Sequence, residues 1–124
     1  MTQAAFFILT ALIDEPRHGY GIVREVEELS DGDVRLRVGT LYGVLDRLAA
    51  DGLIELDREE VQQGRLRRYY ALTDDGAAAV SAEAARMAAG ARTAAGRLAA
   101  HRPADARPQP TARPGRPGLA GGGA

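Results

Sequence analysis

Residues 39–54 read GTLYGVLDRLAADGLI and carry a clear helical pattern. Their larger apolar side chains recur at the i, i+3, i+4 and i+7 spacing that gathers side chains on one face of a helix. These residues are Leu41, Val44, Leu45 and Leu48. We therefore predict a helix that opens at Gly39–Thr40, buries this face and ends at Gly52, because glycine readily adopts the left-handed conformation that closes many helices.

The opposite face of this predicted helix is small and polar. It presents Thr40, Gly43 and Arg47, flanked by Tyr42 and Asp46. A helix with hydrogen-bonding side chains on its outer face can lie against a flat surface or enter a groove.

A β-hairpin is predicted directly after this helix. Residues 53–57 and 66–72 have the composition of short strands, and the residues between them include Gly64 at a turn. The connection and the return strand bear the densest basic and aromatic cluster of the predicted folded region. Its arginines are Arg65, Arg67 and Arg68.

Two helices are predicted before residue 39. Residues 2–13 form the first, ended by Pro16, and a second helix runs to about Leu29 with a core stripe that includes Ile22 and Val26. The first helix is apolar nearly all round, which suggests that a second subunit covers part of it. The residues expected at that surface are Phe6, Phe7 and Ile8, with full burial inside one chain as the alternative.

The first helix is too short to span a bilayer and has no basic residue before it, so neither a signal peptide nor a membrane span is predicted. We expect a cytoplasmic protein with no membrane partner.

The C-terminal part of the chain is predicted to contain one long helix and a tail. Thr73 is a good N-cap, and residues 74–100 are rich in alanine. This helix carries a heptad seam typical of a dimerisation helix. The seam residues are Val80, Ala84, Met87, Ala91, Ala94 and Leu98. Residues 101–124, rich in Pro, Gly and Arg, are predicted to be disordered.

The composition argues against an enzyme and against a metal site. The 124-residue chain contains no cysteine and 2 histidines, His18 and His101, and serine is scarce. No cofactor is expected, and His18 is interpreted as a turn residue satisfied by local hydrogen bonds. The net charge of −1 hides an asymmetry, since residues 1–60 hold 13 acidic and 6 basic residues and residues 61–124 hold 4 and 10. An anionic partner for the basic half is one explanation.

The order of these elements, three helices, a hairpin and a further helix, describes a mainly α fold with a β-hairpin. It is the order of a winged helix-turn-helix with an appended C-terminal dimerisation helix. We divide the chain into a DNA-binding domain at residues 1–73, the dimerisation helix at 74–100 and the tail at 101–124. The third helix would meet base edges in the major groove, and the hairpin arginines would meet phosphates or the minor groove.

Four ordered motifs resemble those of the PadR family of transcriptional regulators. They are PRHGYGI at residues 16–22, GTLY at 39–42, the segment from Arg47-Leu48 to Gly52-Leu53-Ile54, and RRYYALTDDG at 67–76. The resemblance covers residues 5 to about 80. It implies a cytoplasmic homodimer that binds a pseudo-palindromic operator in double-stranded DNA and usually represses neighbouring genes, with the first and last helices forming the dimer.

The resemblance also implies roles for particular residues. Tyr20 would touch the DNA backbone, and Arg65 and Arg67 would act from the wing. Thr40, Tyr42 and Arg47 would face the major groove. Some relatives bind an effector at the dimer interface, so a small aromatic or aliphatic molecule can be a further partner.

Tyr70 could contact DNA or lie in the core, and it is interpreted as a core residue because it shares strand parity with Leu66 and Leu72.

One alternative function stays open. The chain could be a winged-helix adaptor that binds a protein, and not DNA, through its apolar helices.

Overall fold

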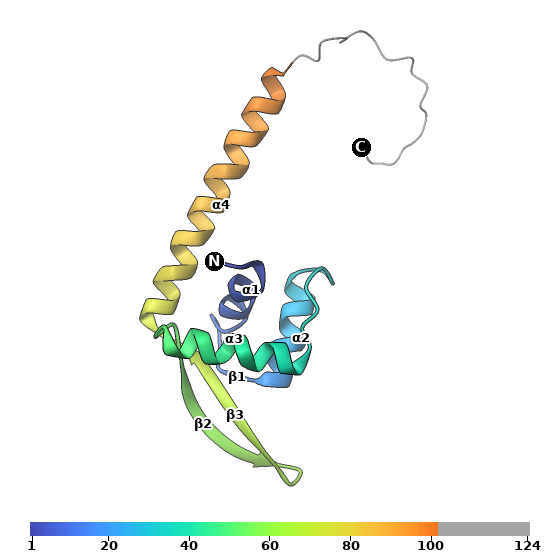
Figure 1. Cartoon of the computed structure of the whole chain (residues 1–124), viewed down its shortest axis with the longest axis vertical. Helices are drawn as coiled ribbons and strands as arrows, with labels where there is room; N and C mark the ends of the chain where they lie inside the picture. The colour runs from blue at the N-terminus through green and yellow to red at the C-terminus, as the bar shows by residue number, and fades with distance from the viewer. Residues whose placement is uncertain (102–124) are drawn as a thin grey trace, which may run out of the picture. The chain divides into compact units, whose positions relative to one another are not determined.

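The computed structural model describes residues 1–101, and the tail predicted to be disordered lies outside the described residues beyond His101. The described chain forms four helices and a small antiparallel sheet, as Figure 1 shows. The elements are α1 (Gln3–Ala11), β1 (Arg17–His18), α2 (Gly19–Leu29), α3 (Val38–Ala50), β2 (Ile54–Gln62), β3 (Arg65–Leu72) and α4 (Asp74–Ala100). The predicted fold class, three helices followed by a hairpin wing and a further helix, is confirmed.

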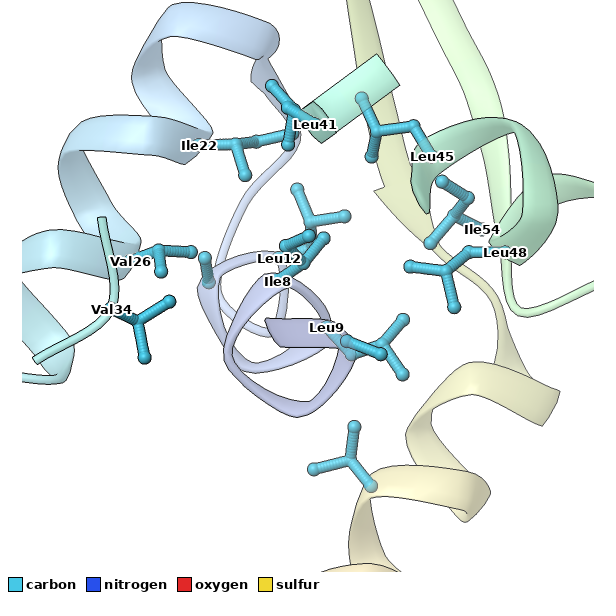
Figure 2. Close-up of a cluster of buried hydrophobic side chains, with 13 residues drawn as sticks. Ile8, Leu9, Leu12, Ile22, Val26, Val34, Leu41, Leu45, Leu48 and Ile54 are labelled. Atoms are coloured by element: carbon cyan, nitrogen blue, oxygen red, sulfur yellow. The ribbon is translucent and has the colours of Figure 1, made fainter. Parts of the chain in front are cut away.

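The core joins α1, α2 and α3 to the sheet and to the start of α4. In Figure 2, apolar side chains from α1 point towards those of α2 and α3. The stripe predicted for α3 is correct, because Leu41, Leu45 and Leu48 are all buried there. Burial of this stripe leaves the polar face of α3 exposed.

Two residues expected at the dimer interface belong to this core instead. Ile8 is fully buried inside the same chain, and Val80 is buried against the same cluster. The dimer assignment is therefore wrong for the Ile8 side chain, and burial within one chain is the correct interpretation. A helix that is apolar nearly all round does not show in its sequence which side the core takes.

Helix ends in this fold are set by residues identified in the sequence. The Thr73 hydroxyl accepts the Gly76 N–H at 3.0 Å and donates to the Gly52 carbonyl at 2.7 Å, which ties the start of α4 to the end of α3. Gly52 has a φ of 77°, and the Leu53 N–H donates to the Leu48 carbonyl at 2.9 Å. This is the 6→1 bond of a Schellman motif, so Gly52 ends α3 as predicted.

The hairpin is longer than its sequence suggested. β2 and β3 pair from Ile54↔Leu72 to Gln62↔Arg65, with an irregularity between Leu56 and Arg58. Gln63 and Gly64 form the turn with φ values of 52° and 76°, so this is a two-residue loop with both φ values positive, as in a type I′ turn. The sequence placed the whole connection at residues 61–65, which is wrong, since Val61, Gln62 and Arg65 continue the strands.

A third strand completes the sheet in the order β1-β3-β2. Arg17 and His18 pair with Tyr70 and Tyr69 of β3. This pairing fixes the start of α2 beside the wing.

The chain divides into two units at Gly90, and the second is described only over residues 91–101. In the first unit, the early turns of α4 pack into the core through Val80. In the second, the described residues continue α4 to Ala100. The division into a DNA-binding domain and a dimerisation helix after residue 73 stays a prediction about function. Among residues 1–101, no helix combines the length and the apolarity needed to cross a membrane.

Candidate nucleic-acid interface

A groove of about 430 Å³ lies between β3 and the first turns of α2 and α3. Its walls are formed by His18, Gly19, Tyr20, Val38, Tyr42, Arg65, Leu66, Arg67 and Arg68. Most of the residues predicted to bind DNA therefore meet in one place: Tyr20, Tyr42 and the three hairpin arginines. They come from three elements, which the pairing of β1 with β3 holds together.

Tyr42 fits into this groove because Gly19 has no side chain. A Cβ atom built on Gly19 would lie 2.6 Å from the Tyr42 hydroxyl oxygen and 3.0 Å from Cζ. The ring therefore lies directly over the backbone at the start of α2 while part of it stays exposed. This role of Gly19 was not predicted, and no local pattern signals it, because it depends on contact between two helices.

The three wing arginines have different surroundings. Arg65 is exposed, and within residues 1–101 no carboxylate lies within 4.0 Å of its guanidinium. Arg68 Nε donates to the Glu59 carboxylate across the hairpin at 3.1 Å. Arg67 is half-buried, with Nη1 3.3 Å from His18 Nδ1. Arg65 is thus the wing cation most available to an external anion, and Arg67 also holds the wing against β1.

Thr40 and Arg47 lie on the other flank of α3. Both are exposed and line a second groove of about 550 Å³, whose walls include Gly43 on α3 and Met1 and Ala5 near the start of α1. The structure therefore does not bring Thr40 and Arg47 together with Tyr42. The outward face of α3 separates the two grooves.

Tyr70 packs against the core, as predicted from its strand parity. Burial, together with the nearby Tyr42 and Asp46, raises the pKa of its phenol. Tyr69, which was not predicted as a site residue, is more deeply buried. Its hydroxyl accepts from Gln62 Nε2 at 2.8 Å, and the Arg58 guanidinium lies 3.9 Å from its ring centroid. Tyr69 thus links Arg58 and Gln62 of β2 to β3.

Residues 8–82, more than half of the chain, match the family model described as "Transcriptional regulator PadR-like family". The chain belongs to the PadR-like family. The resemblance found in the sequence motifs is thereby confirmed. A family of transcriptional regulators also agrees with the expectation that the chain is not an enzyme.

Individual proteins are similar to this PadR-like chain in sequence or in fold. It is 40% identical over 74 residues to the transcriptional regulator Rv3488 of Mycobacterium tuberculosis, a match covering 60% of this chain and 65% of that protein. A PadR family transcription regulator from Clostridium difficile R20291 has a similar fold, with a TM-score of 0.68 at 23% identity over 78% of this chain and 99% of the other. Bacillus subtilis PadR in complex with operator DNA gives a TM-score of 0.56 at 24% identity over 62% and 44% of the two chains.

His18 connects the wing of this PadR-like fold to α2. Its Nδ1 accepts the Gly21 N–H at 3.2 Å and so caps α2. Its ring meets Tyr69 edge-on, with centroids 5.2 Å apart. The interpretation of His18 as a residue satisfied by local hydrogen bonds is confirmed, and its contacts also reach the wing. Burial, and secondarily the charge of Arg67, lower the pKa of His18 below 6.5.

This lowered pKa predicts a pH-dependent stability. Between the folded-state pKa of His18 and 6.5, the unfolded chain binds the proton more readily than the folded chain, so unfolding is favoured as the pH falls. The stability that depends on neutral His18 is complete above pH 6.5 and is lost as the pH falls below that value. Thermal unfolding measured from pH 7.5 to 5 should show a fall in stability that His18→Asn removes, because asparagine can cap a helix but does not titrate in this range.

His101 provides the matched control, since it is exposed at the end of the described chain. His101→Asn should leave the pH profile of the wild-type protein unchanged. If stability depended on pH equally in the wild type and in His18→Asn, the attribution of this pH dependence to His18 would be wrong.

Proposed function

We propose that this PadR-like chain is a homodimeric, sequence-specific DNA-binding protein that represses transcription of neighbouring genes. One observation carries the proposal. The groove at the start of α3 combines exposed tyrosines, Tyr20 and Tyr42, with wing arginines, and Arg65 there is exposed without a carboxylate partner among the described residues. Arginines beside a helix with an exposed hydrogen-bonding face suit duplex DNA, which offers phosphates and base edges together.

In this proposal, α3 enters the major groove and the wing follows the adjacent backbone. Tyr42 contacts bases from one flank of α3, and Thr40 and Arg47 contact them from the other. Arg65 and Arg68 contact phosphates, while Arg67 combines a phosphate contact with its contact to His18. Tyr20, exposed in the first turn of α2, contacts the backbone. The Bacillus subtilis PadR structure, which holds operator DNA, supports this arrangement through its similar fold.

The proposed dimer uses α1 and α4. Phe6 and Phe7 are partly exposed on α1 and meet edge-on, with centroids 5.6 Å apart. Met87 is 50% exposed in the first compact unit, and Leu98 is 73% exposed in the second. Apolar side chains left in water at these positions favour burial against a second chain. A cytoplasmic location and release by a small aromatic or aliphatic effector remain predictions from the family resemblance.

The salt dependence of DNA binding tests this function. Arg65→Ala should weaken binding to fragments selected from genomic DNA of the host. It should also lower the slope of log K against log[salt] by about 1 for each phosphate that Arg65 neutralises, because each neutralised phosphate releases condensed counterions. Fluorescence anisotropy at several salt concentrations measures this slope.

Arg86→Ala is the matched control, since Arg86 is exposed on α4 and paired with Glu83. It should leave the slope unchanged. Salt-insensitive binding, or failure of the folded protein to bind any selected fragment, would overturn the proposal and favour the adaptor alternative.

A further inference from the structure

Val38 is an exposed apolar side chain at the first turn of α3. It is 55% exposed and is the first residue of the helix. It stands four residues before Tyr42, so both side chains lie on the same flank of α3. Both line the groove beside the wing.

The surroundings of Val38 combine apolar surface with positive charge. Leu66, 59% exposed on β3, lines the same groove, as do Arg65 and Arg68. The leucines of α3 and Val44, by contrast, pack in or against the core. An apolar side chain kept in water beside Arg65, which has no carboxylate partner among the described residues, suits a ligand that carries both negative charge and a small apolar group.

Duplex DNA has such a group in the major groove. Thymine presents its C5-methyl there, and no other DNA base carries one at that position. The N-terminal residues of a recognition helix are those that contact base edges. Val38 occupies this position, with wing arginines placed to hold the adjacent phosphates.

We propose that Val38 reads the C5-methyl group of a thymine in each operator half-site. This inference rests on the proposed DNA-binding function and names one base that the site selects. The contact removes the methyl group and the Val38 side chain from water together. Its contribution to affinity corresponds to about one buried methyl group per half-site.

Replacement of thymine by deoxyuridine tests the inference, because uracil lacks only that methyl group. In selected duplexes, each thymine of a half-site is replaced in turn and the dissociation constant is measured by anisotropy. We expect one position at which the wild-type protein loses about fourfold in affinity per half-site. Val38→Ala should bind the thymine and uracil duplexes equally at that position, and Val38→Ile should restore the preference for thymine.

Val61→Ala is the matched control, since Val61 is also exposed but does not line the groove. It should keep the preference for thymine. Circular dichroism confirms that each variant is folded, and the uracil series with the wild-type protein does not depend on any variant. The inference would be overturned if no thymine-to-uracil replacement changed the affinity, or if Val38→Ala kept the preference for thymine. Either result would leave the proposed function intact. Absence of DNA binding would overturn both.

Discussion

Replacement of Gly76 by alanine is expected to lower the free energy of unfolding by about 3 kcal/mol, at the upper end of the usual range for overpacking. A Cβ atom on Gly76 would lie 2.1 Å from the Leu53 carbonyl oxygen and 2.7 Å from Leu72 Cδ1. The carbonyl belongs to the backbone and already accepts the Thr73 N–H at 3.1 Å, so it cannot move aside without breaking that bond. The first turn of α4 would have to shift away from the hairpin.

Gly90 provides a control in the same helix, because a Cβ atom there would meet nothing within 4 Å. Gly90→Ala should raise stability by about 0.5–1 kcal/mol through helix propensity alone. Thermal and urea unfolding of the two variants should therefore shift in opposite directions. A Gly76→Ala protein as stable as the wild type would show that α4 does not pack against the hairpin in this way.

Replacement of Leu45 by alanine is expected to cost about 2–5 kcal/mol, as for other large-to-small changes in a core. Leu45 is fully buried and lies at the centre of the stripe by which α3 packs against the core. Truncation leaves a cavity there because the surrounding side chains can close it only partly. Urea unfolding at constant pH measures the resulting fall in stability.

Leu56→Ala is the matched control, since Leu56 lies on β2 with about half of its surface exposed. Its cost should stay below about 1 kcal/mol, as for surface positions away from special features. At temperatures where the Leu45→Ala protein remains folded, the slope of log K against log[salt] for its binding to DNA should match that of the wild type, because no groove residue has changed. Equal stabilities for the two variants would contradict the placement of α3 on this core.

Periodicity predicted α2 and α3 well because each of them buries a definite stripe of side chains in the core. The stripe of α3 and the end of that helix at Gly52 are both as predicted. The hairpin was less predictable. Its outer half is largely exposed, and the charged residues Arg58, Glu59 and Glu60 follow one another in β2, so alternation stops while pairing continues. A strand that buries neither face leaves no periodic signal.

Most residues of the candidate site were predicted from the sequence, but the way in which they meet in one groove was not. The sequence placed Tyr42 on α3 and the arginines on the wing, but a two-residue strand such as β1 is too short to carry any pattern. That strand brings His18 and Gly19 against the wing, and only then do Tyr42 and Arg67 share a groove. The contact of His18 with Tyr69 on the wing, and the close approach of Tyr42 to Gly19, could not be predicted for the same reason.

The sequence by itself therefore determined the order of the four helices and the hairpin, the buried stripe of α3, the caps at Thr73 and Gly52, and the family. These features depend on neighbours within a few residues, where helix geometry dictates contacts. Only the tertiary structure decided that Ile8 is core, that Arg67 rests on His18, and that Thr40 and Arg47 lie in a different groove from Tyr42. Those features depend on contacts between segments far apart in the chain, and such contacts form only when the helices and the sheet pack together.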